Sequence, residues 1–145
     1  SMPRLTGSTF VAIALLLVLS GCGPAASPEP TTRPVADTDL VGRWRYFGDV
    51  RRATIEIEFT ADNKFTQTVV VTGGASKTQQ GTWSLANAKV TLRDVLMNSS
   101  GAGSDLANWT PQYGGWWFTD SGGKFDLYGG AHPDPDACDP LERLK

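Results

Sequence analysis

Catalytic and metal-binding side chains are scarce in this sequence. Its 145 residues include one histidine, His132, and two cysteines, Cys22 and Cys138. No serine or cysteine near His132 lies in a nucleophile motif, so the sequence offers no basis for a catalytic triad or a histidine-based zinc site. Two cysteines are also too few for the disulfide framework of many small secreted domains. We therefore expect a protein that is not an enzyme and that needs no cofactor or metal.

A basic excess and a long hydrophobic run are missing too. The chain has 13 Lys and Arg against 15 Asp and Glu, so there is no electrostatic case for nucleic-acid binding. Its apolar run Phe10–Leu19 is too short for a transmembrane helix, which needs about 20 such residues. The run does fit the core of a secretory signal, with Arg4 as the positive charge ahead of it. Residues 1–21 are thus predicted to be a signal peptide, in which Ser1 is a remnant of a cleaved expression tag.

The apolar run ends in Leu19-Ser20-Gly21-Cys22. These four residues resemble the lipobox of bacterial lipoproteins, and the resemblance implies that Cys22 becomes a lipidated N-terminus. Acyl chains on this cysteine would hold the protein on a bilayer, with about 0.8 kcal/mol contributed by each buried methylene. The alternative is an ordinary signal peptide followed by an incidental cysteine. On the first interpretation the protein lies in the cell envelope, anchored to a membrane and facing the periplasm or the cell exterior.

A proline-rich stretch follows the cysteine. Residues 23–38, GPAASPEPTTRPVADT, contain almost no large apolar side chains and cannot form a packed element. We predict that residues 22–38 are a lipidated, disordered tether with a mean reach of roughly 20–25 Å. Residues 39–145 remain, which is enough chain for one domain with one core.

Period-two alternation dominates this domain. In 53–59, ATIEIEF, Ile55, Ile57 and Phe59 alternate with polar residues, which is typical of a strand with one wet face. No part of the domain has a convincing helical period, and Asp105–Trp109 has room for one turn at most. The pattern predicts an all-β fold, a small antiparallel up-and-down barrel of about eight strands. The expected strands are 42–47, 53–59, 65–71, 79–85, 89–96, 115–119, 124–130 and 141–144.

Two Gly-x-Trp motifs lie on expected strands, at Gly42 and Trp44 and again at Gly81 and Trp83. Together with the hairpin pattern of 40–96, they resemble the bacterial lipocalin-like lipoprotein domains. The resemblance implies a lipocalin-like barrel. It also implies that a basic residue from the last strand lies across the first-strand tryptophan, and Arg143 is the well-placed candidate over Trp44. Such a stack contributes about 1 kcal/mol or more.

Aromatic residues crowd the second half of the domain. If 115–119, GWWFT, is a strand, Trp116 and Phe118 share one face and Trp117 points the other way. One interpretation is that a loop over 98–115 covers Trp117. The other is an aromatic patch that binds a ligand or a partner, which Trp109 and Tyr113 on that loop would join.

Three polar features have a structural and a functional interpretation. Gln67 lies on the apolar face of its strand, where it would either orient a ligand or bond to backbone or water. Glu56 and Glu58 share a face as a glycosidase pair would, but their alternation with isoleucine indicates a solvated strand face. The acidic residues around Cys138 lack the glycine and the distant glutamate of a calcium loop, and their prolines favour a fixed turn instead. They also disfavour a reactive thiolate, so we expect Cys138 to be inert.

Two functions remain open. The first is a membrane-anchored module that binds a small apolar ligand in its barrel. The second is a filled barrel that binds another envelope protein through its aromatic loop, as an interaction or inhibitor module. An interior cavity of about 300 Å³ or more supports the first, whereas an interior filled by the two Gly-x-Trp tryptophans and Phe59 supports the second. The candidate ligand-binding residues are Trp44, Gln67, Trp83, Trp109, Tyr113 and Trp117.

Overall fold

The computed structural model describes residues 31–48, 52–98, 104–129 and 140–145. Within these ranges the chain is all-β, apart from one short helix, α1 (Asp37–Leu40), and one 3-10 turn, η1 (Leu106–Asn108). The predicted signal peptide, Cys22 and the acidic tail around Cys138 lie outside the described residues. The strands are β1 (Gly42–Gly48), β2 (Ala53–Phe59), β3 (Lys64–Val71), β4 (Ser76–Ala86), β5 (Lys89–Asn98), β6 (Trp109–Ser121), β7 (Lys124–Tyr128) and β8 (Glu142–Leu144).

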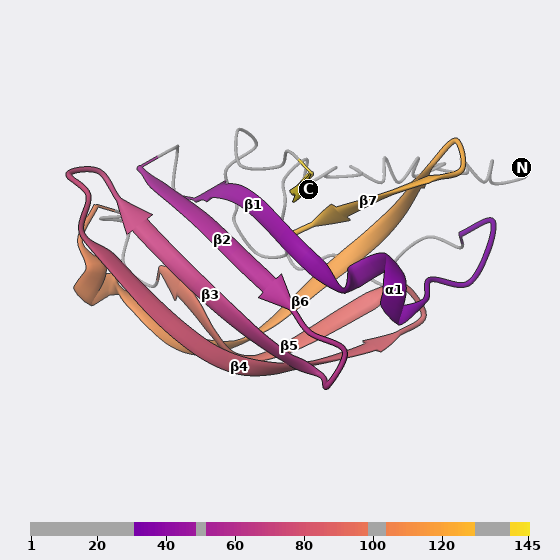
Figure 1. The fold of residues 1–145 in the computed structure, drawn as a ribbon, viewed down its shortest axis with the longest axis horizontal. Coiled ribbons are helices and arrows are strands. Elements are labelled where there is room, and N and C mark those ends of the chain that lie inside the picture. The colour runs from indigo at the N-terminus through magenta and orange to yellow at the C-terminus, as the bar shows by residue number, and fades with distance from the viewer. Residues whose placement is uncertain (1–30, 49–51, 99–103, 130–139) are drawn as a thin grey trace, which may run out of the picture.

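The eight strands form a single antiparallel sheet in the order β7-β6-β5-β4-β3-β2-β1-β8. Figure 1 shows that this sheet is strongly curled, into a half-barrel with a concave inner face. The predicted all-β, eight-stranded, up-and-down architecture is therefore confirmed. From β1 to β7 consecutive strands are neighbours, and tight turns connect several of them, as between β2 and β3 or β6 and β7.

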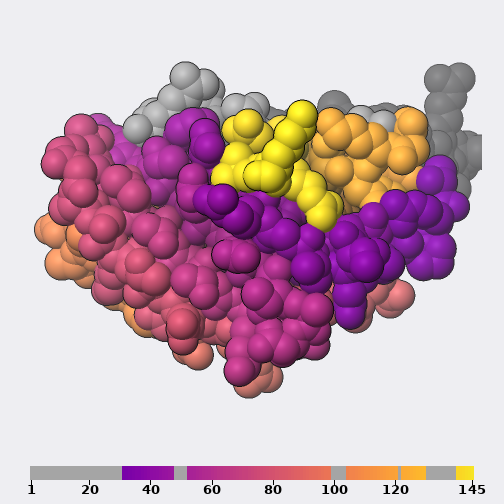
Figure 2. Space-filling view, in the orientation of Figure 1, coloured from indigo at the N-terminus to yellow at the C-terminus, as the bar shows by residue number. Residues whose placement is uncertain are grey.

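The last strand brings the two ends of the sheet together. β8 pairs with β1, with Trp44 opposite Arg143. Just before β8, the Leu141 amide donates to the Leu127 carbonyl of β7, at 2.8 Å. In Figure 2 the C-terminal residues lie between the start of the domain and the β7 region. β7 and β8 are the two edges of the half-barrel, and they form no ladder with each other in the described residues. The backbone hydrogen bond from Leu141 to Leu127 joins these edges.

The alternation that predicts the strands also sorts their side chains. On β2 and β3 every second residue is buried, and the residues between them are at least partly exposed. The buried faces line the concave side of the sheet and form two apolar clusters. The larger cluster includes both Gly-x-Trp tryptophans and lies beneath β1, β4, β6 and β7. The smaller one consists of Ala53, Ile55, Val69, Val71, Leu96 and Trp109.

The smaller cluster forms because β5 leaves β4 halfway along its length. Residues Thr82–Ala86 of β4 pair with β5, but Ser76–Gly81 pair only with β3. At the departure point the β5–β6 register shifts between Leu92 and Val95, and Asp94 has φ 65°. This is a β-bulge, which bends a strand and increases its twist. The bend turns the second half of β5 over the concave face of β2 and β3.

A glycine is required where the two strands separate. A Cβ on Gly81 would lie 2.1 Å from the Arg93 carbonyl oxygen and 2.4 Å from the Phe65 ring. The first of these atoms belongs to the backbone and cannot move aside without shifting β5. Gly81 of the second Gly-x-Trp motif therefore has a steric reason to lack a side chain.

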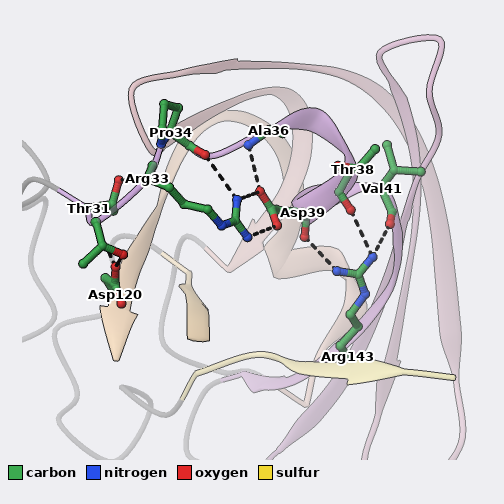
Figure 3. A network of polar contacts seen from close by, with 10 residues as sticks. Thr31, Arg33, Pro34, Ala36, Thr38, Asp39, Val41, Asp120 and Arg143 are labelled. Atoms are coloured by element: carbon green, nitrogen blue, oxygen red, sulfur yellow. Dashed lines mark hydrogen bonds and ion pairs between the residues drawn. The ribbon is translucent and has the colours of Figure 1, made fainter. Parts of the chain in front are cut away.

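The end of the predicted tether lies against the sheet, in contrast to the expectation of a free segment up to residue 38. The Thr32 amide donates to Asp120 Oδ2 of β6 at 2.9 Å, and the Thr32 hydroxyl bonds to the same oxygen. Arg33 pairs with both carboxylate oxygens of Asp39 and lies 4.2 Å from the centroid of the Phe125 ring. Figure 3 shows the pairing of Arg33 with Asp39. Val35 packs on the larger cluster, so apolar burial adds to the polar contacts.

Replacing Gly81 by alanine is expected to destabilise the domain strongly. We expect Gly81→Ala to lower the free energy of unfolding by about 3 kcal/mol or to prevent folding, because the new methyl group overlaps a backbone oxygen. Urea unfolding followed by tryptophan fluorescence measures this. The matched control is Gly115→Ala, whose Cβ would meet the movable end of Lys89 at 3.3 Å. A Gly81→Ala protein as stable as the control would contradict the steric assignment.

The attachment of residues 31–39 is expected to weaken in acid. Hydrogen bonds from Arg33 and Thr32 lower the pKa of the Asp39 and Asp120 carboxyls, respectively, below their ordinary value of 3.8. A lowered pKa means that the attachment is stabilised above pH 3.8 and loses this stabilisation as the pH falls through the folded values. Arg33 and Arg143 are the cations that face Asp39, and Arg33 also faces Asp120. NMR should show the Thr32 amide resonance moving toward its random-coil position as the pH falls below 3.8, and a resonance that stays unchanged until the whole domain unfolds in acid refutes this assignment.

Candidate functional site: the outer face of strands β5 to β7

The two Gly-x-Trp tryptophans are buried and bonded within the chain. The Trp44 indole N–H donates to the Leu40 carbonyl at 2.8 Å, at the end of α1. The Trp83 indole N–H donates to the Thr60 and Lys64 carbonyls, each at 3.1 Å. Trp83 therefore fixes the β2–β3 turn, and Trp44 fixes the helix that leads into β1. Neither indole nitrogen is left to orient a ligand.

Arg143 makes the contact that the sequence resemblance implies. Its guanidinium carbon lies 5.1 Å from the centroid of the Trp44 ring, a cation–π distance. The same group donates to the carbonyls of Thr38, Asp39 and Val41, at 3.4, 2.9 and 2.6 Å (Figure 3). These carbonyls belong to the last turn of α1, where helical hydrogen bonding ends. Arg143 therefore joins the last strand, the first strand and the helix.

The side-chain amide of Gln67 makes the hydrogen bonds to Leu96 that a neighbouring strand would otherwise make. Its side chain is fully buried, its Oε1 accepts from the Leu96 amide at 2.6 Å, and its Nε2 donates to the Leu96 carbonyl at 3.1 Å. A second bond from Nε2 reaches the Tyr46 hydroxyl at 3.2 Å. Leu96 lies in the half of β5 that has left β4, so its backbone has no strand partner on that side. The amide of Gln67 thus satisfies a backbone unit that the split of the sheet leaves open.

Aromatic rings occupy the concave interior in two groups of contacts. The Phe59 ring lies 6.1 Å from Phe65, 6.3 Å from Trp83 and 5.9 Å from Trp116, measured between centroids, and each pair is edge-to-face. Further pairs are Trp44 with Phe118 at 6.4 Å and Tyr46 with Trp116 at 5.4 Å. Edge-to-face packing at these distances is favourable and belongs to a dense core. The two Gly-x-Trp tryptophans and Phe59 thus take part in filling the interior.

The expected loop over 98–115 is shorter than predicted. β6 begins at Trp109, which pairs with Asn98, so residues 109–114 continue the sheet. The prediction failed because Gly114 and Gly115 resemble turn residues, whereas Gly114 is buried in the strand. Trp109 is only 4 % exposed and belongs to the smaller cluster. It therefore does not join Tyr113 on the surface.

Trp117 and Tyr113 do face outward. Trp116 and Phe118 are buried, as the alternation predicts, while Trp117 is half-buried on the opposite face. Tyr113 precedes it by four residues on the same face and is 66 % exposed, the highest exposure among the large apolar residues described. Tyr113 lies opposite the bulge in β5, between Gln112 and Gly114, which pair with Val95 and Leu92.

Neighbouring strands add a third ring and two cations to this surface. Tyr128 of β7 and Lys89 of β5 both pair directly with Trp117, and the Lys89 ammonium lies 5.7 Å from the centroid of a Trp117 ring. Arg93 follows Lys89 by four residues on the same face and lies at the bulge beside Tyr113. We call this surface the aromatic face and define it as Lys89, Arg93, Tyr113, Trp117 and Tyr128.

The charges on the aromatic face differ from those on the opposite outer surface. On β1 and β2, Arg43 and Arg45 pair with Glu56, at 3.2 and 3.6 Å. Within the described residues, neither Lys89 nor Arg93 takes part in a salt bridge. The Trp117 indole nitrogen likewise has no hydrogen-bond partner in that part of the chain. The aromatic face therefore retains cations that have no carboxylate partner in the described residues, beside one exposed ring and two half-buried rings, which suits association with another molecule.

The described residues contain no arrangement for metal chemistry. No group of three or more His, Cys, Asp or Glu side chains among them is placed to hold a metal ion. Glu56, the first member of the apparent glycosidase pair, is occupied by its two arginines on the outer surface. No helix in the described part of the chain is long and apolar enough to cross a membrane.

No protein-family profile, curated protein or solved structure matches this chain.

Reasoning from sequence identified Tyr113 and Trp117 but missed the other members of the aromatic face. Tyr128 was recognisable as part of the aromatic run, and its register with Trp117 could follow from the DSGG turn between their strands. Lys89 and Arg93 carry no such signal, because an alternating lysine or arginine on a strand is typical of any wet face. Only the pairing of β5 with β6 places them beside the rings.

Replacing Gln67 distinguishes a structural amide from a ligand-orienting one. Gln67→Leu keeps the size of the side chain but leaves the buried Leu96 N–H and C=O without partners. We expect it to lower the free energy of unfolding by about 2–4 kcal/mol. The control is Gln79→Leu, a half-buried glutamine that bonds only to its neighbour's carbonyl and should change stability by about 0.5 kcal/mol. Equal stabilities in chemical denaturation would return Gln67 to the candidate ligand-binding residues.

Proposed function

We propose that this chain is a membrane-anchored protein of the cell envelope that binds another envelope protein through the aromatic face. The filled interior carries this proposal. A carrier of a small apolar molecule needs a cavity, and the space beneath the sheet is taken by the linked rings of Phe59, Trp83 and Trp116. The second of the two functional hypotheses is therefore the better supported one.

The composition of the aromatic face suits a protein partner. Tyrosine, tryptophan and arginine are the residues that most often carry the energy of protein–protein interfaces. Here Tyr113, Trp117 and Arg93 lie on one face of two paired strands. Strands hold side chains more rigidly than a loop does, so less conformational entropy is lost on binding.

The anchor in this proposal is Cys22. It follows a signal-type apolar run and precedes a proline-rich stretch, the context in which a lipobox occurs. Two acyl chains hold a protein on a membrane far better than one. The domain thus acts at a membrane surface, where confinement raises its effective concentration toward other anchored proteins.

Site-specific photo-crosslinking in the native host tests the proposed interface. We expect a photoreactive residue at Tyr113 to yield an adduct of one defined mass, because this side chain is 66 % exposed at the centre of the proposed interface. The matched control is Phe47, a 52 % exposed aromatic residue on β1, which should give no adduct of that mass. The second measurement is native mass spectrometry of the purified protein. A co-purifying small molecule, together with no adduct at Tyr113, would favour the internal-ligand hypothesis instead.

A further inference from the structure

The first described residues are attached to one particular part of the domain, the β6–β7 hairpin. Asp120, at the end of β6, accepts through Oδ2 from the amide and the hydroxyl of Thr32. Its other oxygen, Oδ1, accepts from the Gly123 amide in the hairpin turn at 2.9 Å. Asp120 thus holds Thr32 and its own turn with the same carboxylate. Arg33 adds its contact with the ring of Phe125, on β7.

A second attachment lies at α1. Arg33 also forms a bidentate pair with Asp39, and Asp39 accepts from the Ala36 amide at 2.8 Å. Leu40 is fully buried in the larger cluster, and Arg143 holds the helix from the other side (Figure 3). The segment Thr31–Asp39, which we call the N-terminal clamp, is therefore fixed at both of its ends.

The clamp shortens the stretch of chain between Cys22 and the first attachment to the domain. An extended chain spans at most about 3.5 Å per residue, so the ten residues from Cys22 to Thr32 reach about 35 Å. Attachment at Asp39 alone would allow about 60 Å, by the same rule. The mean reach of a flexible chain of ten residues is less, about 16–19 Å.

The length of β6 shows why the difference between the two tether lengths affects the orientation of the domain. β6 has 13 residues, so at about 3.3 Å per residue it is up to about 40 Å long. The hairpin lies at one end of β6 and η1 lies at the other. If η1 faced the lipid surface, the attachment at Asp120 would stand up to about 36 Å away, which requires an almost fully extended tether and is about twice the mean reach of 16–19 Å. A tether of about 60 Å would permit either orientation.

We propose that the N-terminal clamp orients the domain on the membrane, with the β6–β7 hairpin toward the lipid and the η1 end, with Tyr113, away from it. This inference rests on the proposed anchoring at Cys22. Tyr113 lies closer along β6 to Trp109 than to Ser121, so the clamp presents it on the half of the domain that faces away from the bilayer. A chain without the clamp would lose this bias while keeping its anchor.

Fluorescence quenching in vesicles tests the orientation. The acylated full-length mature chain, in a Cys138→Ser background, is labelled at Lys124→Cys beside the hairpin or at Ser104→Cys beside η1, both exposed positions. The vesicles are phosphatidylcholine with nitroxide-labelled headgroups. We expect quenching at position 124 to exceed that at position 104 about threefold or more. The reason is that the mean reach of the tether keeps the hairpin near the lipid headgroups and η1 away from them.

The clamp variant Thr32→Ala/Arg33→Ala removes the hydroxyl and guanidinium contacts to Asp120, Phe125 and Asp39. It should reduce the quenching ratio to near one, whereas Arg52→Ala, an exposed arginine outside the clamp, should preserve it. Equal quenching at both positions of the parent chain, or an unchanged ratio in the clamp variant, overturns the proposal.

Two further readouts separate this inference from the proposed function. Intact-mass analysis shows whether Cys22 carries acyl groups, and an unacylated chain defeats both the anchor and the orientation. Hydrogen exchange of the Thr32 amide tests the clamp itself in either form of the chain. We expect protection in the parent and exchange about tenfold faster in the clamp variant. An unprotected Thr32 amide in an acylated chain defeats the clamp and leaves the anchor standing.

Discussion

The close passage of β5 over Gly81 decides the shape of this domain. Gly81 has no side chain, so the Arg93 carbonyl of β5 can lie where a Cβ would otherwise be. β5 can therefore leave β4 and bend across the concave face of β2 and β3. The bend brings Leu96 and Trp109 into the core and makes the amide of Gln67 necessary as a substitute for a strand partner. The same bulge places Arg93 beside Tyr113 on the outer face. One steric constraint thus shapes both the interior and the outer surface.

Close ring packing in the interior moves the search for function to the outside. In an open barrel the aromatic residues of the strands would line a cavity, but here they contact one another edge-to-face. The outer surface is divided into two parts with different electrostatics. Ion pairs satisfy the arginines of β1, whereas the cations of β5 lie beside exposed rings. A partner protein can pair with the cations of such a surface and bury its apolar area at the same time.

Arginine side chains join the two ends of the described chain to the sheet. Arg143 stacks on Trp44 and donates to the carbonyls of α1, and Arg33 pairs with Asp39 from the other side of that helix. A four-residue helix is too short to be stable alone, since helix nucleation is costly. It persists because these guanidinium groups and the buried Leu40 fix it. The entry of the chain into the domain is therefore a structural element rather than a linker.

The sequence by itself determined the all-β class, the eight strands and the face to which Trp116, Trp117 and Phe118 each point. The reason is that the alternation of apolar and polar residues is local to each strand and shows which side chains are buried. It also suggested the contact between Arg143 and Trp44 through a resemblance. Only the tertiary structure decided the role of Gln67, the burial of Trp109 and the cations beside Tyr113. These depend on which strand lies next to which and on where β5 leaves β4, and such long-range pairing leaves no period in the sequence.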